Sequence, residues 1–123
     1  MDRRRVLRLV LLGGGVAVAL ALGKAWPREQ TVHYVLGDAA GRVEEVDARW
    51  AQAAAAEDWA REASFRYAPG QAPRVVTHEP RLPDGDYTVE IDIVASRERT
   101  RVRRRVTLAG GSTSIELAQA VPR

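Results

Sequence analysis

The sequence predicts an all-β fold, a small antiparallel β-sandwich of about seven strands, preceded by an N-terminal hydrophobic helix. Two observations predict the sandwich. From Thr31 onward apolar and polar residues alternate with a period of two, and turn signals recur about every ten residues, as in small sandwich domains. One observation predicts the helix: Leu9–Leu22 is a run of fourteen residues without a charged or strongly polar side chain.

The first 25 residues have the layout of an export signal. Arg3, Arg4 and Arg5 form a basic region ahead of the apolar run. If the segment is a signal peptide, Ala21 and Gly23 are the small residues that a signal peptidase recognises, and cleavage is expected before Lys24. Read as a single-pass anchor, it spans the membrane with Arg3, Arg4 and Arg5 on one side and Lys24 and Trp26 at the other interface. Both alternatives place the rest of the chain outside the cytoplasm, and the anchor is slightly favoured.

Charge and cysteine content restrict the function classes. The chain of 123 residues has a formal net charge of +3, and the whole excess lies in residues 1–23, which carry four arginines and one aspartate. The net charge of the remaining residues is zero, which argues against nucleic acid as a partner. The chain has no cysteine, which excludes disulfides, thiol catalysis and a lipid-modified cysteine anchor.

Residues 31–119 are predicted to form the sandwich, with 26–30 as a linker and 120–123 as a tail. The expected strands are Thr31–Leu36, Val43–Ala51, a segment around Ala63–Tyr67, Arg74–Leu82 at an edge, Asp86–Val94, Arg101–Leu108 and Ser114–Ala118. Between them, Ala48–Ala60 is ambiguous because its alanine run has helical propensity. A β-hairpin with an Ala-rich loop is preferred there over a short helix.

The clearest hairpin joins Asp86–Val94 to Arg101–Leu108. Centring its turn on Arg97 and Glu98 predicts the outer-face pairs Asp92–Arg103, Glu90–Arg105 and Thr88–Thr107, which are favourable cross-strand types. The same register points Arg104 inward, opposite Ile91. The prediction is therefore that Arg104 lies near an open end of the sandwich or that a bulge re-aims it.

The candidate sites are all weak. Arg97, Arg99 and Arg101 near the hairpin tip are the best surface for a weak anionic contact. The two histidines, His33 and His78, have no metal-ligand spacing. Asp84-Gly85-Asp86 reads as a turn rather than a calcium loop. Trp26, Trp50, Trp59, Tyr34 and Tyr67 could form an aromatic platform for a sugar or peptide, but core positions are expected for them. No catalytic residue, cofactor or metal site is predicted.

One motif supports a resemblance. Leu82-Pro83-Asp84-Gly85-Asp86-Tyr87-Thr88-Val89, followed by a returning strand and Gly110-Gly111, resembles the "L-P-x-G-x-Y-x-V" hairpin of small exported β-sandwich modules, the carboxypeptidase-regulatory-like (transthyretin-like) and PEGA-type domains. The resemblance covers about residues 74–118 and implies a non-catalytic accessory or interaction domain. The Ala-rich first half departs from the compact PEGA pattern.

The function expected from the sequence is a non-enzymatic interaction or structural module of a bacterial-type cell envelope, tethered to the membrane by its N-terminal helix. Its expected partner is an envelope protein or polymer. The alternative is an extracytoplasmic module that binds carbohydrate or a peptidoglycan-like polymer. An unrecognised hydrolase built on the two histidines is the least favoured hypothesis.

Overall fold

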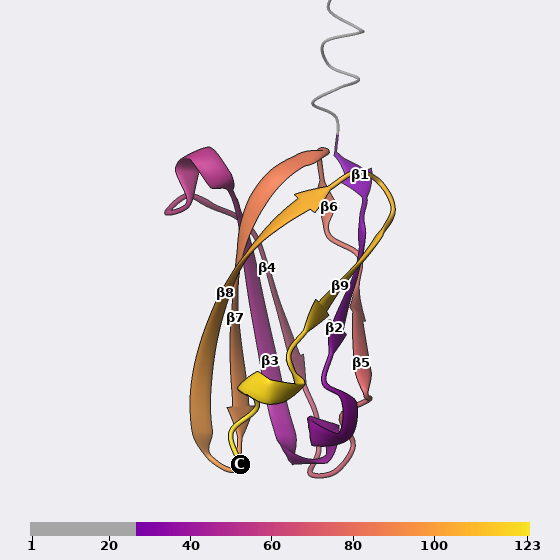
Figure 1. Cartoon of the computed structure of the whole chain (residues 1–123), viewed down its shortest axis with the longest axis vertical. Coiled ribbons are helices and arrows are strands. Elements are labelled where there is room, and N and C mark those ends of the chain that lie inside the picture. Colours follow the sequence, from indigo (N-terminus) through magenta and orange to yellow (C-terminus); the bar gives the residue numbers. More distant parts are fainter. Residues whose placement is uncertain (1–26) are drawn as a thin grey trace, which may run out of the picture.

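A computed structural model describes residues 27–123 (Figure 1). The predicted N-terminal helix, with Arg3, Arg4, Arg5, Lys24 and Trp26, lies outside the described residues. The described chain is mostly β. Its strands are β1 (Arg28–Glu29), β2 (Thr31–Val35), β3 (Val43–Gln52), β4 (Trp59–Arg66), β5 (Val75–His78), β6 (Arg81–Leu82), β7 (Gly85–Ala95), β8 (Glu98–Leu108) and β9 (Ser112–Glu116). Three short 3-10 turns complete it, η1 (Gly37–Arg42), η2 (Ala53–Ala55) and η3 (Ala118–Ala120), and no helix within residues 27–123 is long and apolar enough to cross a membrane.

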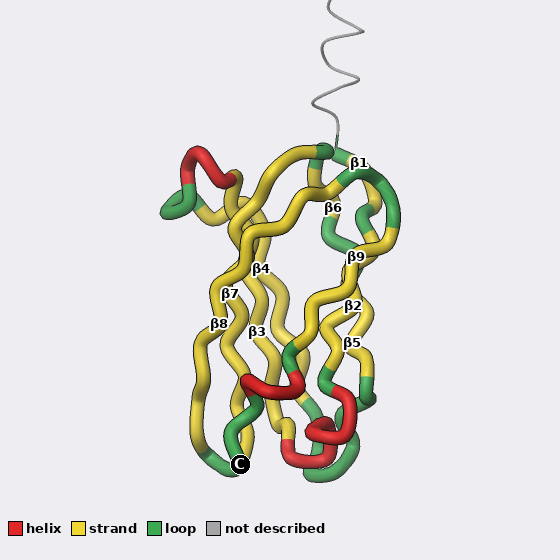
Figure 2. The backbone as a smooth tube through the Cα atoms, viewed as in Figure 1, coloured by secondary structure: helices red, strands yellow, loops and turns green. Residues whose placement is uncertain are grey.

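Two sheets face each other across one core (Figure 2). The larger of these has four strands in the order β4-β3-β7-β8, and the smaller has three in the order β5-β2-β9. β1 and β6 form a further two-stranded sheet. The fold is therefore all-β, with multiple antiparallel sheets, as predicted. One pairing differs from the purely antiparallel expectation, because β2 and β9 run parallel, with Thr31 opposite Ser112 and Val35 opposite Glu116.

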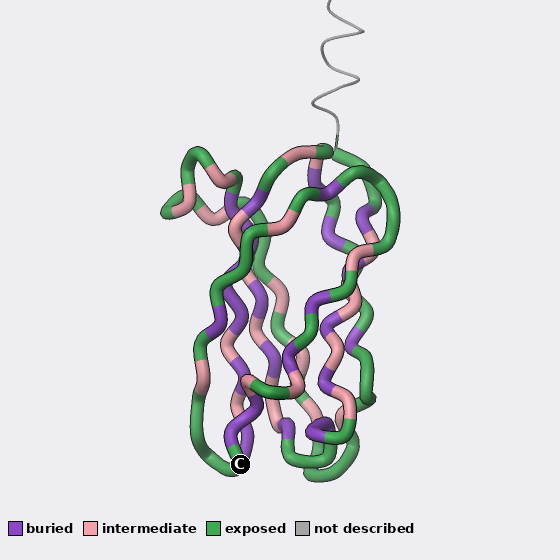
Figure 3. Tube along the Cα trace, in the orientation of Figure 1, coloured by how far each residue is buried: buried purple, intermediate pink, exposed green. Residues whose placement is uncertain are grey.

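The core fills the space between the two sheets (Figure 3). The alternating residues Val46, Ala48 and Trp50 of β3 are buried, and so are all four predicted inward residues of β7, Tyr87, Val89, Ile91 and Ile93. The smaller sheet contributes Val32 and Tyr34 from β2, Val76 from β5 and Ile115 from β9. The period-two alternation therefore predicts the buried faces of β3 and β7 correctly, because only one face of the sheet is covered by the other sheet.

The Ala-rich segment forms the predicted hairpin. β3 and β4 pair antiparallel from Glu45 opposite Arg66 to Ala51 opposite Trp59, and the loop between them contains the single turn η2. β-Strand pairing on both sides of β3 outweighs the helical propensity of the alanines, since β3 also pairs with β7 along its whole length. Segment 74–82, predicted at an edge, supplies β5, which is an edge strand of the smaller sheet.

The folded domain extends beyond its predicted limits at both ends. In the segment predicted as a linker, β1 pairs with β6, and the pairing of β2 with β5 continues in the same register. Gln30, which connects β1 to β2, is completely buried. In the predicted tail, Val121 is buried and Arg42 Nε donates to the carbonyl oxygen of Pro122. Short segments of this kind are fixed by partners far away in the chain, which local sequence patterns do not reveal.

The predicted register of the β7–β8 hairpin is wrong by two residues. Glu90 lies opposite Arg103, Asp92 opposite Arg101 and Thr88 opposite Arg105. The turn is formed by Ser96 and Arg97, whose φ angles are 51° and 67°. Two consecutive residues with positive φ are typical of a type I′ turn, the two-residue connection that matches the twist of antiparallel strands.

The turn residues provide a stability prediction. Ser96 and Arg97 both adopt a backbone conformation that costs L-residues energy, and Asn-Gly is the pair best suited to it. The double substitution Ser96→Asn and Arg97→Gly is expected to raise the free energy of unfolding by about 1 kcal/mol. Urea denaturation followed by circular dichroism checks this, with Arg97→Lys as a control that should leave the midpoint unchanged. An unchanged or lower midpoint for the double variant would contradict the type I′ assignment.

Candidate functional site

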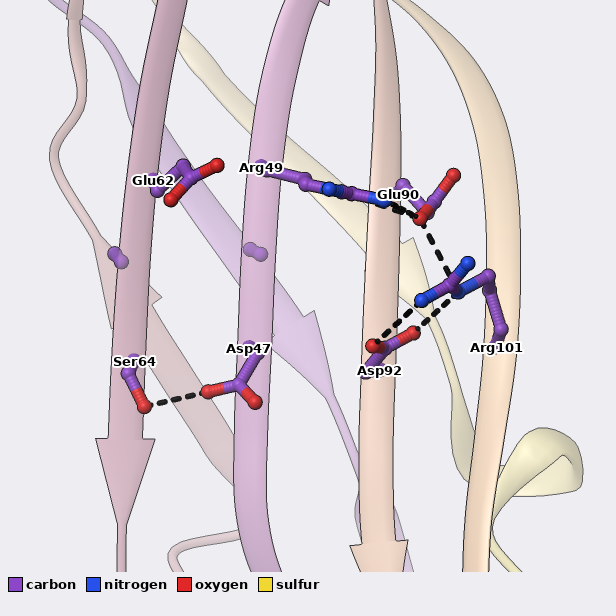
Figure 4. Close-up of a pocket in the computed structure, with 9 residues that line it drawn as sticks. Asp47, Arg49, Glu62, Ser64, Glu90, Asp92 and Arg101 are labelled. Atoms are coloured by element: carbon purple, nitrogen blue, oxygen red, sulfur yellow. Dashed lines mark hydrogen bonds and ion pairs between the residues drawn. The ribbon is translucent and has the colours of Figure 1, made fainter. Parts of the chain in front are cut away.

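The outer face of the four-stranded sheet carries a ladder of charged side chains (Figure 4). Its centre is Glu90 on β7, whose side chain is only 3% exposed although it lies on the outer face. Arg103 Nη2 donates to Glu90 Oε2 at 2.8 Å from β8, and Arg49 Nε donates to Glu90 Oε1 at 3.1 Å from β3. Arg101 Nε lies 3.1 Å from the same Oε1. One carboxylate is therefore enclosed by three guanidinium groups from the two neighbouring strands.

Asp92 forms the next rung of the ladder. Arg101 Nε donates to Asp92 Oδ1 at 2.9 Å, and Arg99 Nη1 donates to Oδ2 at 3.1 Å. The hydrogen bond from Arg103 holds the pKa of Glu90 below its usual value against the opposing effect of burial, with Arg49 and Arg101 adding to the effect. Arg101 in the same way lowers the pKa of Asp92. Both carboxylates therefore stay ionised at neutral pH.

A shallow depression of about 390 Å³ lies over this ladder, lined on β3 and β4 by Asp47, Arg49, Glu62 and Ser64 and on β7 and β8 by Glu90, Asp92 and Arg101 (Figure 4). Its polar groups largely satisfy one another. Ser64 Oγ donates to Asp47, and Arg49 Cζ stacks 4.3 Å from the ring centroid of Trp59. Because the arginines and carboxylates neutralise each other, this face offers little unpaired charge to a ligand.

The arginines predicted for a weak anionic contact separate into two groups. Arg99 and Arg101 are part of the ladder, with both guanidinium groups paired to carboxylates. Arg97 lies in the exposed β7–β8 turn and forms no ion pair with a residue of the described part. The three residues thus do not form one free basic stripe.

The two histidines lie on different faces of the smaller sheet. His33 contacts Thr77, its cross-strand partner, at 3.3 Å between Nδ1 and Oγ1. His78 is turned toward the core, where its Nδ1 lies 3.0 Å from the hydroxyl oxygen of Tyr34. Within residues 27–123 no three His, Cys, Asp or Glu side chains come together in an arrangement that could hold a metal ion.

Tyr34 joins His78 to Trp50 in a chain of hydrogen bonds inside the sandwich. Trp50 Nε1 donates to the Tyr34 hydroxyl at 3.1 Å. Burial raises the pKa of Tyr34, so its hydroxyl keeps its proton, and the hydroxyl shares a hydrogen bond with His78 Nδ1 whose donor is set by the tautomer of His78. His78 also packs edge-on against Phe65, with ring centroids 5.5 Å apart. Local sequence patterns do not reveal this series of hydrogen bonds, because Tyr34, Trp50 and His78 come from three different strands, β2, β3 and β5.

His78 makes stability depend on pH in a definite direction. Burial lowers the pKa of His78 below its ordinary 6.5, so the unfolded chain takes up a proton at this residue more readily than the native chain does. The free energy of unfolding is therefore expected to fall as the pH decreases below about 6.5 toward the lowered pKa of the native state. Urea denaturation at pH 7.5 and at lower pH measures this. His78→Phe should flatten the dependence in this window and His33→Gln should not; a slope that His78→Phe leaves intact would contradict the assignment.

A second polar cluster fixes the end of the domain where the described chain begins. The Gln30 side chain is completely buried, and its Nε2 donates to the carbonyl oxygen of Leu82 at 3.0 Å and to Asp84 at 2.9 Å. Its Oε1 accepts from the backbone N–H of Gly110 at 2.8 Å. Arg28 pairs with Asp84 at 2.7 Å. Asp84, considered above for a calcium loop, thus serves as the acceptor for these two side chains.

The aromatic residues considered for a surface platform divide into buried and partly exposed ones. Trp50 and Tyr34 are completely buried, so they belong to the core and not to a surface platform. Trp59 and Tyr67 are partly exposed at separate places, and Trp26 lies outside the described residues.

Comparisons of the chain with protein-family models, with curated proteins and with solved structures find no match.

Proposed function

We propose that this chain is an exported, membrane-tethered β-sandwich domain that acts without catalysis by holding another component of the cell envelope. The proposal is supported by the N-terminal sequence together with the place where the domain begins. The apolar segment predicted as the anchor ends at Ala25, and β1 begins at Arg28. So short a connection leaves little free chain between a bilayer and the sandwich.

The end of the domain next to this connection is fixed by its own contacts. The buried Gln30 and the Arg28–Asp84 ion pair hold β1 to the β6–β7 and β8–β9 connections. The β7–β8 turn and the C-terminus lie at the opposite end (Figure 1). A tethered domain would then stand with its β1 end toward the membrane, and its sheet edges and far turns would face potential partners.

Intact mass and fractionation of the expressed full-length chain test the tether. The expected result is a full-length mass in the membrane fraction after a high-salt wash, with Leu20→Arg moving the protein out of that fraction. Arg61→Gln, a change on the exposed part of β4, is the matched control and should have no effect. A mass that begins at Lys24 in a soluble envelope fraction would contradict the tether.

Photo-crosslinking in cells tests the holding of a partner. A photoreactive residue is placed in turn at Thr77 on β5, Arg61 on β4 and Thr107 on β8, which sample three edge strands of the two sheets. A discrete adduct with an envelope component from at least one position is the expected result. Absence of any adduct from all three edges would argue against an interaction module.

A further inference from the structure

The two sheets leave an open groove along one side of the sandwich, between β8 and β9. These strands meet at their connecting loop and then diverge, with η3 between them at the far end (Figure 1). The groove has a volume of about 390 Å³, and its lining includes Arg104 and Val106 of β8 and Ile115 and Glu116 of β9. Both strands are edge strands, since β8 pairs only with β7 and β9 only with β2.

Arg104 occupies a position that the strand pattern would assign to the core. It lies opposite Val89, between the inward residues Val102 and Val106, yet it is exposed. The next inward residue, Val106, is only partly buried. The inner face of β8 thus extends past the smaller sheet here, and an arginine with an apolar neighbour faces the groove instead of the core.

The charge around this groove is not neutralised as it is on the outer face. Arg99, Arg101 and Arg103 are paired with Asp92 and Glu90. Arg104 and Arg105 form no ion pair with any residue among 27–123; Arg104 donates only to the carbonyl oxygen of Arg103. Glu116, the acidic residue of the lining, accepts from the backbone N–H of Ala118.

The free edge of β8 adds backbone hydrogen-bonding groups. Ala95 and Glu98 flank a two-residue turn, so they form a hydrogen-bonded pair, and the register to Leu108 is unbroken. Residues at odd numbers from Arg99 to Thr107 therefore turn their N–H and C=O groups away from β7. Such an edge is a template for strand addition, in which the backbone supplies affinity and the side chains supply specificity.

We propose that the groove between β8 and β9 binds an extended acidic segment of a partner protein, which adds to the edge of β8. On the inner face, one of its side chains would be apolar and cover Val106, and another would be a carboxylate that pairs with Arg104. On the outer face, its carboxylates would pair with Arg105. This deepens the function proposed above and rests on it. A second copy of the chain is a poor occupant, because pairing β8 with itself sets arginines against arginines.

The test uses the full-length chain in detergent micelles and a dye-labelled peptide in which valine and glutamate alternate, except that one central valine is replaced by glutamate to face Arg104. Binding is followed by fluorescence anisotropy. The glutamate peptide is expected to bind, and the same peptide with lysine in place of glutamate is expected to bind at least about tenfold more weakly. Arg104→Ser with Arg105→Ser should weaken binding by about tenfold or more. Arg61→Ser with Arg97→Ser removes the same charge away from the groove and should leave affinity unchanged.

Backbone methylation of the peptide tests the strand-addition geometry. Because only alternate residues of an added strand donate to β8, N-methyl groups on one alternate set should abolish binding and those on the other set should preserve it. Equal loss in both sets, equal binding of the two charged peptides, or an equal effect of both double variants would overturn the proposal. Stronger binding of dextran sulfate than of the glutamate peptide, lost equally in both double variants, would identify a general polyanion surface instead and would also overturn it.

The groove between β8 and β9 and the function proposed above are tested separately. If the peptide does not bind while the crosslinks from Thr77 or Arg61 capture an envelope component, the groove assignment is wrong and the interaction module stands. If no edge gives an adduct and the chain is soluble, the function proposed above is wrong independently of the peptide result.

Discussion

Trp50→Ala is expected to lower the free energy of unfolding by about 3–5 kcal/mol. Trp50 is among the largest completely buried side chains and lies on β3, an inner strand of the four-stranded sheet. The substitution would leave a cavity between the sheets, remove the edge-on contact with Tyr87 at 6.2 Å between ring centroids and break the hydrogen bond to Tyr34. A loss of this size approaches the whole stability of many small domains, so a largely unfolded protein at 37 °C is expected.

Urea denaturation followed by far-ultraviolet circular dichroism measures this loss without relying on the deleted fluorophore. Trp59→Ala is the matched control, since Trp59 is partly exposed and contributes mainly its contact with Arg49; a loss of about 1 kcal/mol or less is expected. Trp50→Phe keeps much of the volume and should fall between the two. Similar losses for Trp50→Ala and Trp59→Ala would contradict the position of Trp50 at the centre of the core.

Glu90→Gln is expected to lower the free energy of unfolding by about 2 kcal/mol. The substitution preserves the shape of the side chain but leaves Arg49, Arg101 and Arg103 close together with one carboxylate fewer. The cost is below that of breaking a fully buried ion pair, because the three arginine side chains are 35%, 58% and 53% exposed and water screens their repulsion.

Two measurements separate this electrostatic effect from a packing effect. Glu62→Gln, on the same face and without an ion partner in the described part of the chain, should change stability by less than about 0.5 kcal/mol. A double-mutant cycle of Glu90→Gln with Arg103→Met should show positive coupling, since the second change relieves the crowded charge. Additive losses in the cycle would contradict direct pairing of Glu90 with Arg103.

Acid is expected to weaken the same cluster. The native pKa of Glu90 lies below its ordinary 4.5, so the unfolded chain binds the proton more readily. The stability contributed by Glu90 is present above about pH 4.5 and is lost as the pH falls through the lowered native value. Denaturation between pH 6 and pH 3 should show this loss in the natural protein and a smaller one in Glu90→Gln.

The inner faces of the strands were predictable because burial on one face forces an alternation that the sequence displays directly. Val46, Ala48 and Trp50 on β3 and the four apolar residues of β7 are examples. The hairpin register was not predictable in the same way, because a shift of two residues leaves every side chain on the same face. The turn that fixes the register is formed by Ser96 and Arg97, a pair without the asparagine or glycine that marks a type I′ turn.

The side-chain clusters depended on contacts that local patterns cannot show. The sequence indicated that Glu90 and Asp92 would neutralise arginines of the returning strand, but it gave no reason to place Arg49 beside Glu90, which requires the pairing of β3 with β7. Gln30 was assigned to a linker because its three partners lie 52 to 80 residues away in the chain. Arg104 is exposed, but it lies opposite Val89 beside the groove between β8 and β9, and not opposite Ile91 at an open end of the sandwich as predicted.

The parallel pairing of β2 with β9 has a mechanical consequence. The described chain begins at one end of the sandwich and finishes at the other, and the two strands run side by side from Thr31 opposite Ser112 to Val35 opposite Glu116 (Figure 1). Tension applied between the two ends would draw β2 and β9 past each other lengthwise, so their interstrand bonds would share the load together instead of opening one after another. A domain held at one end and pulled through the other would therefore resist extension as a clamp.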